Sequence, residues 1–253
     1  MQRWKITIEY KGTHYVGWQV QPDGKTVQGS IIDAVSKMCK IKIIVHGAGR
    51  TDSGVHATGQ VAHFDVPSDA PTGSNFTAEK MREALNYFLA NEDISILLAE
   101  KVSDDFHARY SATGRAYCYR LSNRKAPLTF NKDLVWYTGG KQLNIEHMRE
   151  ASQYLVGTQD FTSFRNFDAT NQNPIRTLEY LNIDSHGDEV HITCGSRSFV
   201  HNQVRYMVAA LQLVGYGGWE INRVKEVLDA KDRLKGGPLA PPDGLFLVGV
   251  SYD

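Results

Sequence analysis

The sequence contains no apolar run of about 18 to 20 residues, which is the length that a membrane-spanning helix needs. Residues 1–6 also lack the apolar stretch of a secretory signal. We therefore expect a cytoplasmic protein that has no membrane partner. Low-complexity tracts and short tandem repeats are missing as well.

Cysteine is scarce. The chain has only Cys39, Cys118 and Cys194, and their odd number and wide spacing match neither a disulfide framework nor a zinc site. We predict buried thiols in a reducing compartment.

Motifs for metal and nucleotide binding are missing too. The intervals between His46, His56 and His63 match no familiar set of metal ligands, so hydrogen-bonded structural histidines are the favoured interpretation. No glycine-rich loop ends in Gly-Lys-Ser/Thr, and no G-x-G-x-x-G follows a predicted strand. We expect neither a metal nor a nucleotide cofactor.

An excess of basic residues is also missing, since 28 lysines and arginines balance 28 aspartates and glutamates. The chain therefore cannot hold a nucleic acid by overall charge alone. The stretch from Asp104 to Lys125 is locally positive, with five basic residues against two acidic ones. A solvated surface explains this stretch as well as a basic groove does.

What the chain does contain is an ordinary globular composition, with 253 residues of which 42% are hydrophobic. Period-two alternation and short apolar runs predict strands, and apolar residues at helical spacing predict helices. The predicted strands cover residues 4–10, 41–45, 60–66, 94–102, 116–122, 177–184, 190–194 and 245–252. The predicted helices follow Thr26, Thr77 and Asn144 as capping residues, or begin near Val200 and near Glu220.

This mixture of elements occurs twice, which predicts an α+β protein built from two similar halves, residues 1–105 and 106–253. The halves are predicted to meet near residues 106–113. The regular alternation of strands and helices that builds a nucleotide-binding βαβ sheet is missing. We therefore expect mainly antiparallel sheets whose helices pack on one face only, the outer one.

The densest group of reactive residues lies between two predicted strands, in the glycine-rich segment 47–57. Loops held by strands are favoured places for catalytic residues, and a locally extended chain would project Arg50 and Asp52 to the same side. The alternative is an aspartate that closes a glycine turn and pairs with Arg50. Taken without a family, the two interpretations are about equally good.

A second group lies on the strand predicted at 116–122. Alternation along a strand places Arg115, Tyr117 and Tyr119 on one face, where aromatics among arginines can stack bases and pair phosphates. For an arbitrary strand, half-buried core tyrosines with arginines outside are the favoured alternative.

A third group lies on the helix predicted near Val200. Its apolar stripe consists of Val200, Val204, Met207, Leu211 and Val214. Arg205 adjoins this stripe, beside His201 and Gln212 on a polar one, so it is predicted at the rim of the core, where an arginine usually has a carboxylate partner. By itself, a surface arginine paired with a neighbour is the favoured interpretation.

Taken together and in this order, the segments 47–57, 115–120 and 199–205 resemble the tRNA pseudouridine synthase A family. The resemblance covers essentially the whole chain. It extends from residues 8–13 and 17–19 to residues 241–245, and it includes the segments 160–164 and 230–233. Tyr206 and Ala209 depart from it, because the family usually has asparagine and glycine there.

The resemblance implies an enzyme that converts uridine to pseudouridine at positions 38, 39 or 40 of the tRNA anticodon stem-loop, without a cofactor or a metal. It implies a homodimer whose chains each have two halves joined across a central basic cleft. By the same resemblance Asp52 is the catalytic carboxylate, Tyr117 stacks on the flipped uracil, and Arg50 and Arg205 lie near the site. A noncatalytic RNA-binding protein and a synthase acting on another RNA are the competing interpretations.

Overall fold

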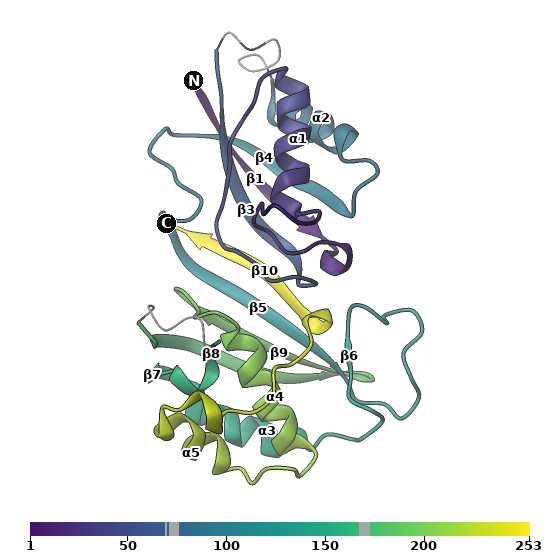
Figure 1. Cartoon of the computed structure of the whole chain (residues 1–253), viewed down its shortest axis with the longest axis vertical. Coiled ribbons are helices and arrows are strands. Elements are labelled where there is room, and N and C mark those ends of the chain that lie inside the picture. The colour runs from purple at the N-terminus through teal and green to yellow at the C-terminus, as the bar shows by residue number, and fades with distance from the viewer. Residues whose placement is uncertain (69, 71–75, 167–172) are drawn as a thin grey trace. The chain divides into compact units, whose positions relative to one another are not determined.

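The computed structural model describes residues 1–68, 70, 76–166 and 173–253 (Figure 1). These residues form two compact units. The first unit comprises Met1–Thr113 together with Leu247–Asp253, and the second comprises Gly114–Phe246. The last strand of the chain therefore contributes most of its length to the first unit.

The first unit is built on a sheet in the order β4-β1-β3-β10, with β2 paired to β3. Strands β1, β2, β3 and β4 pair antiparallel. The strands are β1 (Gln2–Tyr10), β2 (Val45–Gly47), β3 (His56–Val66), β4 (Ile94–Val102) and β10 (Leu245–Tyr252). The predicted alternation in β1 is confirmed, because Trp4, Ile6 and Ile8 are completely buried.

Two helices, α1 (Val27–Cys39) and α2 (Ala78–Phe88), contact each other in this unit and pack on its sheet (Figure 1). Both predicted caps are confirmed. The Thr26 hydroxyl accepts a hydrogen bond from Gly29 N at 3.1 Å, and the Thr77 hydroxyl accepts one from Lys80 N at 3.3 Å. Each cap satisfies a backbone donor that the helix itself cannot pair.

The second unit has its strands in the order β5-β9-β8-β7, with the short β6 beside β5. The pairings β5–β9, β9–β8 and β8–β7 are antiparallel, and β5–β6 is parallel. The strands are β5 (Ala112–Ser122), β6 (Trp136–Tyr137), β7 (Gly157–Asp160), β8 (Ile175–His186) and β9 (Glu189–Ser196). The sheet is therefore mixed but mainly antiparallel.

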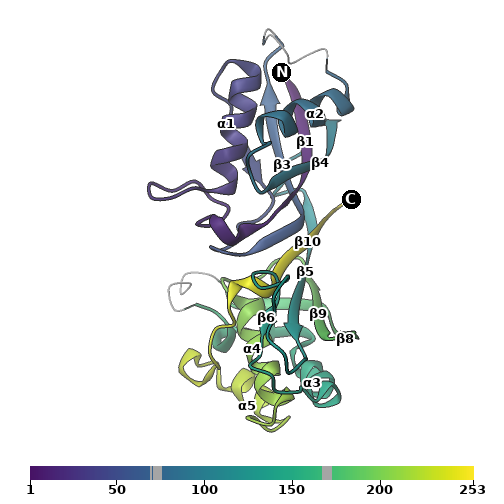
Figure 2. The same ribbon diagram turned by 90° about the vertical axis from the view of Figure 1, so that its right-hand side faces the viewer.

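Three helices, α3 (Ile145–Ser152), α4 (Gln203–Gly215) and α5 (Arg223–Ala230), gather together in this unit (Figure 2). Asn144 caps α3 as predicted, with its side-chain oxygen accepting from His147 N at 3.1 Å. The predicted apolar stripe from Val200 to Val214 is buried along its whole length. Gln212, predicted on the polar stripe, is buried as well.

Some predicted boundaries were wrong. The strand expected at 41–45 begins only at Val45, because Lys40 turns the chain in the left-handed region (φ 57°) and Ile43 N donates to the Ser36 hydroxyl instead of to a strand. The helix expected near Val200 begins at Gln203, after Asn202, which has a φ of 64°. Such a residue cannot belong to a right-handed helix.

The predicted class, α+β with mainly antiparallel pairing, is confirmed. Cys39 and Cys194 are buried as expected, whereas Cys118 is half-buried, and burial raises the pKa of the Cys118 thiol to about 11. No helix in the described part of the chain is long and apolar enough to cross a membrane.

Candidate active site

Arg50 and Asp52 lie on the loop between β2 and β3 in the first unit. Between them Thr51 is buried, whereas Arg50 is exposed and Asp52 is half-buried. This alternation agrees with a locally extended chain that directs both charged side chains away from the core. Arg50 Nε donates to Gln19 Oε1 at 3.0 Å, so Gln19 orients the guanidinium.

A hydrogen bond between two buried hydroxyl groups holds the loop on its inner side. The hydroxyl of Tyr10, at the end of β1, lies 2.8 Å from the hydroxyl of Thr51. Burial raises the pKa of Tyr10 to about 12, against the opposing effect of hydrogen bonds with Thr51 and Gln60, so its hydroxyl stays protonated at neutral pH. Gln60, also buried, donates to Gly49 O at 2.9 Å.

The backbone of the loop packs closely against residues 15–18. Trp18 N donates to Thr51 O at 3.0 Å, and Gly54 N donates to Tyr15 O at 3.3 Å. Gly17 has a φ of +106°, and a Cβ there would lie 2.8 Å from Thr51 O. Only glycine therefore fits at position 17, and this close approach fixes the backbone on which Asp52 stands.

The three histidines near this loop make hydrogen bonds or ring contacts within the first unit. His56 Nδ1 accepts from Gly12 N at 3.0 Å, and His63 Nδ1 accepts from Ala108 N at 3.1 Å, which agrees with the favoured interpretation from the sequence. His46 is exposed and stacks on His63. Among the described residues, no group of three or more histidine, cysteine, aspartate or glutamate residues could hold a metal ion.

Tyr117 lies on β5 in the second unit, opposite Cys194 of β9. Its ring is half-buried and meets the ring of Phe199 edge to face, with centroids 5.1 Å apart. Tyr119, predicted on the same face, is completely buried and donates its hydroxyl to Pro241 O at 2.7 Å. The core interpretation therefore holds for Tyr119, whereas Tyr117 is only half-buried.

Arg205 lies in the first turn of α4 and is half-buried, at the rim of the core as predicted. Its Nε donates to Ala240 O at 2.7 Å, and its Nη1 donates to Asn202 Oδ1 at 3.2 Å. Asn202 precedes the helix in a left-handed conformation, which costs energy for a residue with a side chain.

The segment that ends at Ala240 is itself fixed to the rest of the second unit. The Ser163 hydroxyl donates to Val227 O at 2.6 Å and accepts from Asp232 N at 2.9 Å. The guanidinium of Arg233 lies 3.7 Å from the centre of the Tyr206 ring, a cation–π contact between this segment and α4. Tyr206, which departs from the family pattern, therefore has a packing role in this chain.

The structure thus places the four predicted residues in two pairs. Arg50 and Asp52 share one loop of the first unit, and Tyr117 and Arg205 belong to the second. In the second unit the segments 115–120 and 197–205 meet, since Arg115 Nη1 also donates to Arg197 O at 2.7 Å.

The residues that hold these side chains, notably Tyr10, Gln19 and Asn202, were not predicted from the sequence. A signal was available for Tyr10, because a tyrosine at a core position of a strand needs a partner for its hydroxyl. No local pattern connected Gln19 with Arg50 or Asn202 with Arg205.

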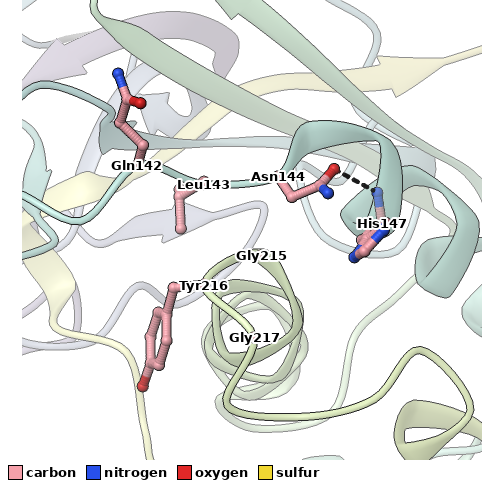
Figure 3. Close-up of a pocket in the computed structure, with 7 residues that line it drawn as sticks. All are labelled: Gln142, Leu143, Asn144, His147, Gly215, Tyr216 and Gly217. Carbon is pink, nitrogen blue, oxygen red and sulfur yellow. Dashed lines mark hydrogen bonds between the residues drawn. The ribbon is translucent and has the colours of Figure 1, made fainter.

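A surface hollow of about 510 Å³ lies in the second unit between the start of α3 and the end of α4 (Figure 3). Leu143, Gly215 and Tyr216 line it, with Asn144 and His147 at its side. None of the four predicted site residues belongs to this lining, so the hollow is not part of the candidate active site.

Comparison with known proteins assigns this α+β chain to a class of RNA-modifying enzymes. A family model described as tRNA pseudouridine synthase matches residues 6–111 and 151–253. The chain belongs to this family.

Bacterial relatives named tRNA pseudouridine synthase A match the chain from end to end. The proteins of Paramagnetospirillum magneticum and Maricaulis maris are each 46% identical over 252 residues, covering 100% of this chain and 96% and 98% of their own lengths. The protein of Rhodopseudomonas palustris is 46% identical over 253 residues and is covered completely.

Proposed function

We propose that this protein converts uridine to pseudouridine in tRNA, with Asp52 as its catalytic carboxylate. The observation that carries the proposal is the 46% identity with synthases of this name over the whole chain. The loop geometry supports the assignment of Asp52, because Thr51 and Gly17 fix a backbone from which the carboxylate projects half-buried. Positioning a reactive group in this way lowers the entropic part of a reaction barrier.

The reaction needs no redox agent or energy donor. The bond between ribose C1′ and uracil N1 breaks, the base turns, and C1′ bonds to C5. C5 loses its proton and N1 gains one, so the product is an isomer of the substrate. An ionised carboxylate can start this sequence by attacking C1′ or by removing a ribose proton. In both routes the carboxylate of Asp52 lies beside the ribose of the target uridine.

Tyr117 is the proposed platform for the target base. A uridine within a stacked stem or loop must be flipped out before its C1′ can be reached, at a cost of a few kcal/mol. Stacking of the uracil on the ring of Tyr117, a half-buried residue, offsets part of this cost. Phe199 supports the arrangement, because its edge-to-face contact holds the tyrosine ring in place.

Arg50 and Arg205 are the proposed phosphate-binding and positioning groups near the site. Each guanidinium already has hydrogen-bond partners that orient it, Gln19 for Arg50 and Ala240 O and Asn202 for Arg205. Preorganised arginines lose little freedom when they bind an anion. Contacts of this kind fix the register of an RNA without reading its sequence.

The finer proposals follow the family. The target uridines are those at positions 38, 39 or 40 of the anticodon stem-loop, in a cytoplasmic homodimer that acts without a metal. Mapping the pseudouridines in tRNA after incubation with the enzyme tests the positions. The mass in solution, measured by light scattering, tests the dimer, and a mass near the 28.3 kDa of one chain would contradict it.

The decisive experiment is tritium release from tRNA labelled at uracil C5. We expect Asp52→Ala to lower turnover by more than about a thousandfold, because the carboxylate acts on the bond itself. Binding of tRNA should stay largely intact, because phosphate contacts dominate affinity. Asp33→Ala, which removes an exposed carboxylate from α1, is the matched control. Undiminished turnover of Asp52→Ala would overturn the mechanism.

A further inference from the structure

Four aromatic rings form a continuous series in the first unit. His46 of β2 stacks on His63 of β3, with centroids 5.0 Å apart and an interplanar angle of 21°. His63 meets His107 at 4.6 Å, and His107 meets Tyr110 at 4.3 Å with an angle of 35°. We call His46, His63, His107 and Tyr110 the aromatic series.

The aromatic series is exposed at His46, buried at His63, and exposed again at Tyr110, which we call its outer end. His63 is 2% exposed, His107 is half-buried, and Tyr110 is 76% exposed. The guanidinium of Arg109, which is also exposed, lies 5.8 Å from the centre of the Tyr110 ring. The outer end of the series therefore presents an aromatic face and a positive charge together.

The turn that carries Tyr110 is held by hydrogen bonds from several elements. His107 Nδ1 accepts from Arg109 N at 3.1 Å and from Tyr110 N at 3.3 Å, and Ser111 N donates to His107 O at 2.9 Å. The hydroxyl of Tyr252 donates to Ala108 O at 2.7 Å. The turn is therefore fixed in place even though its tip lies in solvent.

The two inner rings are neutral at physiological pH. Burial, with the neighbouring histidines, lowers the pKa of His63 to about 4, and burial also lowers the pKa of His107. Their Nδ1 atoms accept hydrogen bonds from backbone N–H groups, so each neutral ring carries its proton on Nε2. Positive charge at the outer end comes from Arg109 rather than from the histidines.

Packing of the protein itself does not explain the position of Tyr110, because most of its side chain remains in water. A core role would bury the ring, as happens for Tyr119 in the second unit. An exposed ring on a rigid turn loses little conformational freedom when a flat ligand stacks on it. A nucleobase is such a ligand, and the phosphate attached to it can pair with a neighbouring arginine.

We propose that Tyr110 and Arg109 form a second base-stacking site, on the first unit, which binds a nucleotide of the RNA substrate other than the uridine that reacts. This proposal rests on the proposed function for the identity of the substrate. Tyr110 stacks on the base, and Arg109 pairs with a phosphate of the same strand. The contact tolerates any base, because every base has a π face.

The test compares variants of Tyr110 in binding of unmodified tRNA transcript and of a single-stranded uridine oligonucleotide. Base-on-aromatic stacking is lost in Tyr110→Ala and in Tyr110→Leu, and we expect the dissociation constant for tRNA to rise about tenfold in both. Tyr110→Phe and Tyr110→Trp keep a ring and should stay within about twofold of the wild type.

Tyr87→Ala is the matched control, because Tyr87 is 78% exposed in the same unit and also has an aromatic neighbour, Phe88. Its affinity for RNA should equal that of the wild type. In steady-state assays Tyr110→Ala should raise KM and leave kcat nearly unchanged, because the ring binds RNA without touching the reacting atoms.

Binding without turnover separates this proposal from the proposed function. If the wild type binds RNA through Tyr110 but releases no tritium, the proposed function fails and the stacking site stands. If Tyr110→Ala and Tyr110→Leu bind RNA as tightly as the wild type, the stacking site is overturned. A change in mass by light scattering with unchanged RNA binding would likewise overturn it, in favour of a contact between copies of this chain.

Discussion

The hydroxyl of Tyr10 lies 2.8 Å from the hydroxyl of Thr51, one residue before the aspartate on which the proposed chemistry depends. Both side chains are buried, so water cannot replace either partner. The pair connects the end of β1 with the loop between β2 and β3. Four predictions concern this loop, Arg205 of the second unit, and the aromatic series.

Tyr10→Phe removes the buried hydroxyl and leaves Thr51 without this partner. We expect the free energy of unfolding to fall by about 1 to 2 kcal/mol, since an unsatisfied buried hydroxyl costs about that much. Turnover should fall several-fold with tRNA affinity unchanged, because the loop is less well fixed. Urea unfolding and tritium release measure the two effects. Tyr87→Phe, at an exposed position, should change neither.

Gly17→Ala forces a Cβ to within 2.8 Å of Thr51 O in a conformation that disfavours any side chain. We expect at least about a tenfold loss of turnover, together with destabilisation of more than about 1 kcal/mol. Gly49→Ala, in the loop that carries Asp52, is the control, because a Cβ there has no atom within 4 Å. Equal activity of the two variants would show that the contact with Thr51 does not position Asp52.

Arg205→Lys keeps the positive charge but cannot reproduce the planar pair of bonds to Ala240 O and Asn202 Oδ1. If these bonds position the charge, kcat should fall about tenfold or more, nearly as far as in Arg205→Ala, while tRNA affinity changes by less than about threefold. Arg223→Lys on α5, where the arginine pairs with Glu226, is the control. If Arg205→Lys had the kcat of the wild type, only the positive charge of Arg205, and not its two hydrogen bonds, would contribute to turnover.

Stability should depend on pH through His63. Its pKa is about 4 in the folded protein, against a usual value of 6.5, because burial and neighbouring His107 and His46 disfavour the charged ring. The unfolded chain binds more protons between these values, so stability is fully present above pH 6.5 and falls as the pH drops toward 4. The loss can reach about 3 kcal/mol.

Urea unfolding at pH 7 and pH 5 measures this dependence. His63→Asn offers an oxygen to Ala108 N but does not titrate in this range, so it should lose less stability than the wild type between the two pH values. An identical loss in the variant would mean that His63 does not cause the dependence.

Much of the secondary structure follows from local rules. The buried alternation of Trp4, Ile6 and Ile8, and the caps Thr26 and Thr77, were predictable because each depends on residues a few positions apart. The strand at 41–45 was wrongly predicted, because the left-handed turn at Lys40 and the bond from Ile43 N to Ser36 depend on the end of a helix. Apolar content alone could not show that Ile41 and Ile44 would be exposed.

By itself the sequence determined the α+β class, the main strands and helices, and, through its resemblance to a family, the candidates Arg50, Asp52, Tyr117 and Arg205. These predictions depend on periodicity, capping and motif order, which can be recognised from the order of the residues in the sequence. The tertiary structure alone decided what holds each candidate: Gln19 for Arg50, Phe199 for Tyr117, and Ala240 O for Arg205. It also revealed the aromatic series. Such contacts join residues far apart in sequence, so no local pattern predicts them and only the packed fold brings them together.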